Sequence, residues 1–263
     1  MDIKDLGISK EQLKKILAGR PASPKIIRKN ISDKTFTFGM ISDTHLCSRL
    51  ERLDELHTFY EICRKEEIMN VIHCGDIVDG WGMFRGQENE VHTFGARNQA
   101  EYVIKHYPLV KGITTYFITG NHDCSWWNKS GVDIGELVAD KRKDMIYMGQ
   151  YQGDITLGDV KIRMLHPDGF VAYALSYRGQ KISEQIPSGH KPHILVLGHF
   201  HTTLYFFYRL IHIFQVGCFQ DQSPFLLRKG INPVIGGWTI KVRVAEDRKK
   251  TILSLTPTFI PFI

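Results

Sequence analysis

The segment Ile194-Leu195-Val196-Leu197-Gly198-His199-Phe200-His201 places two imidazoles directly after a short apolar run. Four consecutive apolar residues followed by glycine predict a buried strand that ends in a loop. Because side chains alternate along an extended backbone, His199 and His201 are expected on one side, with Phe200 on the other. This arrangement suits a pair of metal ligands.

Four other apolar runs end in the same way, each in a loop that offers aspartate, asparagine or histidine. The four loops are Asp43-Thr44-His45 after residues 38–42, Gly75-Asp76-Ile77-Val78-Asp79 after residues 71–74, Gly120-Asn121-His122-Asp123 after residues 113–119, and His166-Pro167 after residues 160–165. A single pair of this kind is weak evidence, since short Asp and His pairs are common. Five in one chain predict a metal site at the ends of several strands.

Together the five motifs resemble the signature of the calcineurin-like metallophosphoesterases, on the phosphodiesterase and nuclease side of that superfamily. The order of the motifs matches over about residues 35–220. The resemblance implies an α/β fold, a sandwich of two mixed β-sheets flanked by α-helices. It also implies two divalent metal ions, with Mn²⁺ favoured and Fe, Zn²⁺, Mg²⁺ or Ni²⁺ as alternatives.

The resemblance also implies seven metal ligands. Asp43, His45 and His201 would hold one ion, Asn121, His166 and His199 the other, and Asp76 would bridge them. His190 and His193 are alternatives to His166, but they precede a predicted strand, whereas His166 ends one. Asp79 is expected to brace its own loop rather than bind metal.

Two further residues are predicted to be catalytic. His122 would face the leaving-group oxygen as general acid or transition-state stabiliser, and Asp123 would orient His122. The expected enzyme is a metal-dependent phosphoesterase that hydrolyses phosphodiester bonds in nucleotides or nucleic acids by attack of a metal-bound hydroxide. The Gly80-Trp81 pair and Asp123 depart from the pattern of protein phosphatases. A small-molecule phosphomonoesterase and a non-catalytic binding scaffold are the alternatives.

Substrate contacts are predicted in two segments beside the motifs. Residues 80–95 are glycine-rich, have no period and contain Arg85, which indicates a loop beside the site. Trp126 and Trp127 follow the Asn-His-Asp motif in a predicted loop, where they could stack on a base or fill a hydrophobic gap. Elsewhere, apolar periodicity predicts helices at residues 50–66, 96–107, 132–141 and 170–186, and a hairpin at residues 146–165.

The chain is predicted to have three parts. Residues 1–34 hold nine basic and four acidic residues, and so most of the net charge of +6. They are expected to form a helix at residues 9–17 and a linker, either contacting nucleic-acid phosphates or packing on the core. Residues 35–256 form the metallophosphoesterase domain. The apolar tail, residues 257–263, could dock on its own domain or on a neighbour.

Composition limits the remaining possibilities. A chain of 263 residues, 43% hydrophobic, can bury one substantial core. There is no run of apolar residues long enough to predict membrane insertion, and the five cysteines form no C-x-x-C. Reduced thiols and a cytoplasmic location are expected. The expected partner is a phosphodiester substrate, DNA or RNA included, and oligomer formation is left open.

Overall fold

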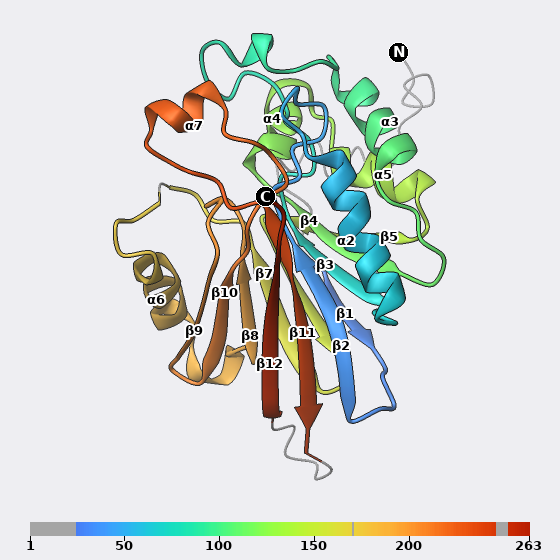
Figure 1. Ribbon diagram of the computed structural model, residues 1–263, viewed down its shortest axis with the longest axis vertical. Coiled ribbons are helices and arrows are strands. Elements are labelled where there is room, and N and C mark those ends of the chain that lie inside the picture. The colour runs from blue at the N-terminus through green and yellow to red at the C-terminus, as the bar shows by residue number, and fades with distance from the viewer. Residues whose placement is uncertain (1–24, 170, 246–251) are drawn as a thin grey trace, which may run out of the picture.

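The fold is a sandwich of two six-stranded mixed β-sheets flanked by helices (Figure 1). The structure, a computed structural model, describes residues 25–169, 171–245 and 252–263. The first sheet has the strand order β1-β6-β7-β8-β10-β9, and the second has the order β12-β11-β2-β3-β4-β5. The predicted α/β class and the pair of mixed sheets are therefore confirmed. The helix predicted at residues 9–17 lies outside the described residues.

Parallel pairing brings several strand ends to one end of the sandwich. In the first sheet the strands are β1 (Ile26–Lys29), β6 (Gln152–Leu157), β7 (Val160–Leu165), β8 (Ile194–Leu197), β10 (Ile211–Gln215) and β9 (Leu204–Tyr208). In the second they are β12 (Ile252–Pro261), β11 (Gly236–Val244), β2 (Thr35–Ile41), β3 (Asn70–Cys74), β4 (Thr114–Thr119) and β5 (Met145–Gln150). β2, β3, β4 and β5 are parallel, as are β7, β8 and β10.

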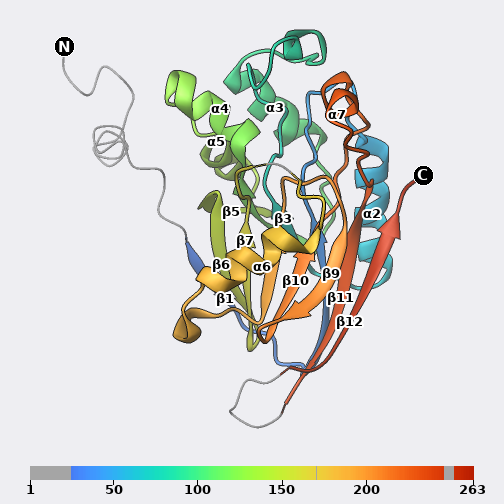
Figure 2. The same ribbon diagram turned by 90° about the vertical axis from the view of Figure 1, so that its left-hand side faces the viewer.

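Helices flank the two sheets or lie over the end of the sandwich where the parallel strands finish. They are α2 (Leu53–Lys65), α3 (Ala96–His106), α4 (Asn121–Ser130), α5 (Ile134–Lys141), α6 (Ser176–Gln185) and α7 (Pro224–Arg228), with 3-10 turns η2 (Gln87–Asn89) and η3 (Ser188–His190). α2, α3 and α5 contribute to a core cluster with strands of the second sheet. α6 lies on the outside of the first sheet, as Figure 2 shows.

Helix α2 illustrates how the apolar pattern becomes packing. Leu56, Phe59, Tyr60 and Cys63 recur at spacings of three and four, and all four are buried. Polar groups on this face also find partners, since the Tyr60 hydroxyl lies 2.7 Å from Thr115 Oγ1. The helix predicted at residues 50–66 is thereby confirmed.

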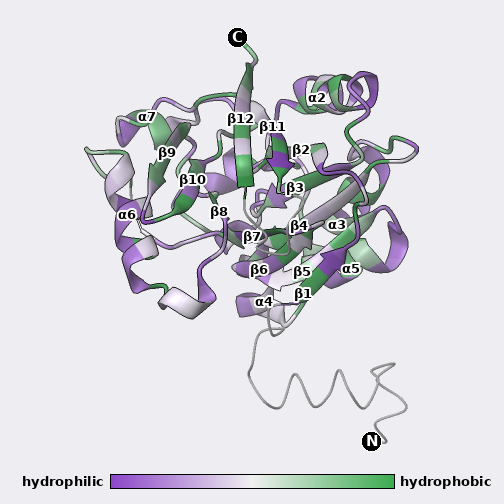
Figure 3. Ribbon diagram, turned by 90° about the horizontal axis from the view of Figure 1, so that it is seen from below, coloured by the Kyte–Doolittle hydropathy of each residue, from purple (hydrophilic) through white to green (hydrophobic). Residues whose placement is uncertain are grey.

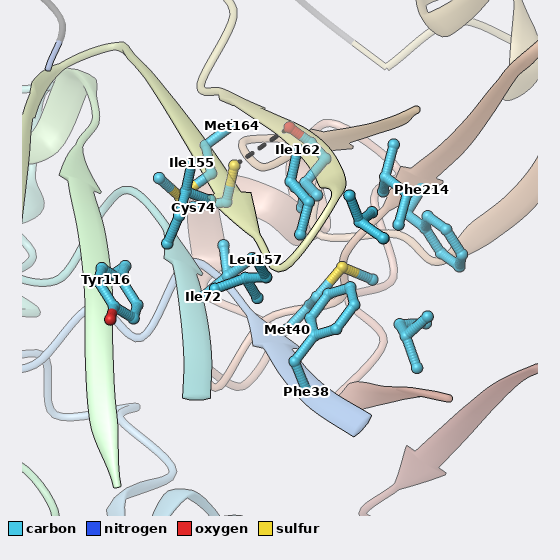
Figure 4. Packing of buried hydrophobic residues seen from close by; sticks show 14 of the residues in the cluster. Phe38, Met40, Ile72, Cys74, Tyr116, Ile155, Leu157, Ile162, Met164 and Phe214 are labelled. Atoms are coloured by element: carbon cyan, nitrogen blue, oxygen red, sulfur yellow. Dashed lines mark hydrogen bonds between the residues drawn. The ribbon is translucent and has the colours of Figure 1, made fainter. Parts of the chain in front are cut away.

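The main core lies between the two sheets (Figure 4). Phe38 and Met40 of β2 face it, together with Ile72 of β3, and residues such as Ile162 and Phe214 approach from the first sheet. The alternate residue Ile41 packs under α2 instead, so β2 is buried on both faces. Figure 3 shows the matching hydrophobic stretches on the strands of both sheets.

Two predicted domain boundaries fall inside strands or sheets. β1 pairs in parallel with β6, so residues 26–29 belong to the first sheet rather than to a linker. β12 pairs with β11 as far as Pro261, opposite Gly236. Residues 257–261 are therefore the end of an edge strand of this domain and not a separate tail.

Three local predictions need correction. Residues 121–130 form α4, where a loop was predicted. The hairpin holds for β6 and β7, but β5 belongs to the other sheet. Helix α6 begins at Ser176 rather than at residue 170.

Candidate metal centre

The seven predicted ligands meet at one end of the sandwich because five strands end there. Asp43 and His45 follow β2, Asp76 follows β3 and Asn121 follows β4. The first sheet contributes His166 after β7, and His199 and His201 after β8. Residues up to 158 positions apart in the chain, Asp43 and His201, are thereby placed side by side.

One cluster consists of Asp43, His45 and His201, whose ligand atoms lie within 4.8 Å of one another. Nε2 of His45 lies 3.1 Å from Nε2 of His201, and Asp43 Oδ1 lies 3.4 Å from the same His201 atom. All three residues are buried. Two imidazole nitrogens and a carboxylate therefore point at one small volume.

A second cluster, Asp76, His166 and His199, lies beside the first. Nε2 of His166 is 3.0 Å from Asp76 Oδ2 and 3.0 Å from Asn121 Oδ1. The same amide oxygen lies 2.9 Å from Nδ1 of His199. Asp76 also belongs to a group with His45 and His122, so its carboxylate faces both clusters.

The alternative histidine His193 lies elsewhere. Its Nδ1 accepts a hydrogen bond from the Lys161 N–H, at the start of β7 rather than at its end. His190 ends the turn η3, which precedes β8. Of the three histidines weighed for this position, the structure brings only His166 into the cluster.

The backbone at these ligands is strained. Asp43, His45, Asp76, His199 and His201 all have positive φ angles, between 43° and 79°. Residues with a Cβ rarely adopt this left-handed conformation, and such outliers concentrate where a site requires them. The chain thus turns sharply at the ends of β2, β3 and β8 to aim the ligand side chains.

Two glycines allow the clusters to close. A Cβ on Gly120 would collide with the Asp76 carboxylate and the His166 imidazole. Gly75 has a φ of 94°, and a Cβ there would collide with the His166 ring. Only the absence of a side chain lets the strand ends approach so closely.

Electrostatics make the centre a place for cations. Burial would raise the pKa of the Asp76 carboxyl, but the charge of His166 and its hydrogen bond hold that pKa well below its usual range. Against the opposing effect of burial, Asp76 raises the pKa of His166 to about 9. Burial lowers the pKa of His45, which keeps its ring neutral and able to bind metal.

The donor set fits two divalent cations. Carboxylate oxygens, imidazole nitrogens and one amide oxygen suit intermediate ions such as Mn²⁺, Fe or Zn²⁺. This donor set agrees with a metal centre.

Asp79 connects the clusters with His122. Its Oδ1 lies 3.0 Å from His45 Nδ1, and its backbone oxygen accepts a hydrogen bond of 2.7 Å from His122 Nδ1. Gln87 and Gln220 donate to the same carboxylate. Asp79 therefore does more than brace its loop, and Gln220 is a contributor that the motif analysis missed.

Asp123 does not orient His122 as predicted. Its carboxylate accepts hydrogen bonds from the backbone N–H groups of Gly120, Ile77 and Val78. It thus caps the start of α4 and ties that helix to the loop after β3. Burial, with the charge of Asp76, raises the pKa of Asp123 to about 7.

The cavity over the centre has a volume of about 170 Å³, and Arg85, Trp126 and Trp127, the three predicted substrate contacts, do not line it. Trp126 is in helix α4, where its Nε1–H donates to Gln99 Oε1. Trp127 lines a separate, shallow pocket, and Arg85 is exposed. The loop predicted at residues 80–95 does lie beside the site, since its Met83, Phe84 and Glu90 line the cavity. Phe225 and Leu226 complete the wall from a segment that no sequence motif indicated.

No helix among the described residues is long and apolar enough to cross a membrane.

Comparison with known proteins gives one family. The family model described as "Calcineurin-like phosphoesterase superfamily domain" matches residues 36–224. Among curated proteins, the DNA polymerase II small subunit of Methanothermobacter thermautotrophicus is 24% identical, over 82% of this chain and 53% of that protein. The DNA polymerase II small subunit of Archaeoglobus fulgidus is also 24% identical, over 77% and 50%. The chain thus spans about half the length of these relatives.

The chain is also similar to solved structures, at lower sequence identity. A structure described as that of a novel archaeal phosphodiesterase has 16% identity and a TM-score of 0.49, over 86% of this chain and 100% of that one. Vacuolar Protein Sorting 29 from Cryptosporidium parvum has 14% identity and a TM-score of 0.45, over 88% and 100%.

Proposed function

The chain belongs to the calcineurin-like phosphoesterase superfamily, and on this basis we propose that it is a dinuclear-metal-dependent phosphodiesterase. The observation that carries the proposal is the convergence of seven ligand-type side chains on two adjoining clusters, five of which line one cavity together with His122. Its substrates are phosphodiesters of the nucleotide or nucleic-acid type. The names of the curated relatives, DNA polymerase II small subunits, support this substrate class.

In this proposal the two clusters each hold one divalent cation. Asp43, His45 and His201 would hold the first, Asn121, His166 and His199 would hold the second, and the carboxylate of Asp76 would serve both. When bound, the two cations would neutralise phosphoryl oxygens and lower the pKa of a water molecule. Mn²⁺ is the first metal to test, before Fe, Zn²⁺, Mg²⁺ and Ni²⁺.

His122 is the residue that serves the leaving group. Hydrolysis joins the oxygen of water to phosphorus, breaks the bond to the leaving oxygen and delivers one proton to that oxygen. Nδ1–H of His122 is held by the Asp79 carbonyl, so Nε2 is the nitrogen turned to the substrate. Protonated His122 donates from Nε2.

A decisive test uses bis-nitrophenyl phosphate, metal-stripped protein and added Mn²⁺. Asp76→Ala should lose both metal and activity, because its carboxylate faces both clusters. His122→Ala should keep metal but lose activity by about 100-fold or more, the usual contribution of a general acid. His57→Ala, a histidine on the exposed face of α2, is the matched control and should behave like the parent.

Two outcomes favour the alternatives. Faster turnover of nitrophenyl phosphate than of the diester would make the protein a phosphomonoesterase. Full metal occupancy with no turnover of either ester would leave a non-catalytic subunit of a larger assembly. That second candidate draws support from the curated relatives, which are named as subunits and are about twice as long.

The proposed compartment is the cytoplasm. All five cysteines lie in the described residues, are buried and form no disulfide. Buried thiols in that state agree with a reducing environment.

A further inference from the structure

Part of the wall of the cavity that holds the metal clusters is apolar. Met83 and Phe84 reach it from the segment between β3 and α3, and Phe225, Leu226 and Ile231 reach it from α7 and the residues after it. Both segments lie at the same end of the sandwich in the two ribbon views (Figures 1 and 2). A ligand whose phosphate sits on the clusters would therefore also meet hydrocarbon in this cavity.

Phe84 and Phe225 are the centre of this wall. Their rings are stacked, with centroids 4.4 Å apart and planes inclined by 15°. Both rings are half-buried and both line the cavity. The stack joins two segments that are 141 positions apart in the chain.

Hydrogen bonds hold both segments of the wall in place, and one set of them connects the wall to Asp79 beside the metal clusters. Gln87 Oε1 accepts from the Met83 N–H at 2.9 Å, while its Nε2 donates to the Asp79 carbonyl and carboxylate. On the other side, Ser223 Oγ accepts from the Leu226 N–H and caps α7. The aromatic pair is thus positioned relative to the same Asp79 that contacts His45 and His122.

Charge argues against a long polyanion in this cavity. None of the described residues that line it is a lysine or an arginine, whereas Asp76, Asp79 and Glu90 do line it. A groove that follows a nucleic-acid backbone needs cations along its length. Lys229 borders the wall, with its Nζ 5.8 Å from the centroid of the Phe225 ring, but a cation at this one place does not form a track along a strand.

We infer that Phe84 and Phe225 form a subsite for the nucleobase next to the scissile phosphate. This inference rests on the proposed function and adds a substrate class. The substrate is a nucleotidyl phosphodiester that the protein recognises by contact with one of its bases. Base–aromatic stacking is tolerant of sequence, because every base has a π-face. One base and one phosphate are then bound together in the same cavity.

Binding to Mn²⁺-loaded protein tests the subsite without relying on turnover. Thymidine monophosphate and deoxyribose phosphate share their phosphate and sugar, so the ratio of their Kd values isolates the base. Calorimetry should give a ratio of about 5- to 100-fold in favour of the nucleotide. Phe84→Leu and Phe225→Leu should each remove most of that preference while leaving the Kd of deoxyribose phosphate within about twofold.

Phe207→Leu is the matched control, because Phe207 is 55% exposed on β9 and does not line the cavity. Phe84→Tyr should restore the ratio, since it keeps the ring. Equal Kd values for the two ligands would overturn the inference even if diesters are hydrolysed. If the ratio of Kd values were as expected but no diester were hydrolysed, the base subsite would stand and the proposed function would be refuted.

Oligothymidylate gives a second readout. It should bind no more than about threefold more tightly than the mononucleotide, with a similar salt dependence. If oligothymidylate bound much more tightly than the mononucleotide and salt abolished the difference, a row of cationic side chains would be binding the strand. That result would also overturn the inference.

Discussion

Oδ1 of Asp79 lies 3.0 Å from Nδ1 of His45, so this carboxylate fixes which nitrogen of the imidazole faces the metal cluster. Nε2 of His45 is then the nitrogen turned to His201. Carboxylates that hold a ligating histidine in this way also increase its basicity.

Replacing Asp79 should therefore weaken metal binding without removing a ligand. We expect Asp79→Asn to lower Mn²⁺ affinity by about 10- to 100-fold, measured by calorimetry on metal-stripped protein. Asp221→Asn is the control, since that carboxylate is half-exposed and pairs with Arg52. Equal affinities for the parent and Asp79→Asn would rule out the orienting role.

Gly120→Ala should damage the centre although glycine carries no ligand atom. Its new Cβ would displace either the Asp76 carboxylate or the His166 ring. Metal analysis of the purified variant should show the loss of at least one ion per chain. Gly189→Ala is the matched control, because a Cβ there meets nothing within 4 Å. A fully loaded Gly120→Ala protein would mean that the strand ends can separate at little cost.

The Trp126→Phe variant tests whether the Trp126 side chain anchors α4 to Gln99 or contacts the substrate. The indole N–H donates to Gln99 Oε1, and Gln99 Nε2 donates to the carbonyls of Gly80 and Thr93. Losing the indole donor leaves a buried acceptor unpaired, which should cost about 1–2 kcal/mol of unfolding free energy in a urea titration. KM should stay within about twofold, as expected for a side chain outside the cavity. A raised KM with unchanged stability would instead make Trp126 a substrate contact.

His73 should make the protein sensitive to acid. Burial lowers the pKa of His73 to about 3, well below the value of an unfolded histidine. As the pH falls below about 6.5, the unfolded chain gains a proton that the folded one does not, so stability is lost toward about pH 3.

The size of this effect can be measured with His73→Gln. Between about pH 7 and about pH 4.5, metal-free parent should lose roughly 2–3 kcal/mol more unfolding free energy than the variant. The two proteins should respond alike between about pH 7 and about pH 8. If the parent and His73→Gln lost the same unfolding free energy at acid pH, His73 would be protonated in the folded state.

The sequence was most informative where one local pattern determines both structure and chemistry. An apolar run followed by Asp, Asn or His predicts a strand and the polar group at its end, and five such runs converge as expected. The pattern failed at α4, because Gly120-Asn121 resembles a turn. The helix is specified there by Asp123, which accepts the Gly120 N–H, and by Gly131, whose φ of 69° ends it.

Two other features depend on distant parts of the chain. β12 is fixed by its pairing with β11, and it tolerates Pro257 because it is an edge strand. The stack of Phe84 on Phe225 depends on how two remote connections meet over the cavity. Hydrophobic periodicity cannot report such contacts, since neither segment has a period.

The placement of the ligands at five strand ends has a consequence for folding kinetics. No pair of neighbouring motifs contains a complete cluster, and Asp43 meets His201 only when both sheets are in place. Contacts of such high sequence separation form late. The cations would therefore bind a nearly native chain, and their binding free energy would add to the stability of the whole sandwich rather than to one loop. A chelator should consequently lower the Tm of the entire protein in a single cooperative transition.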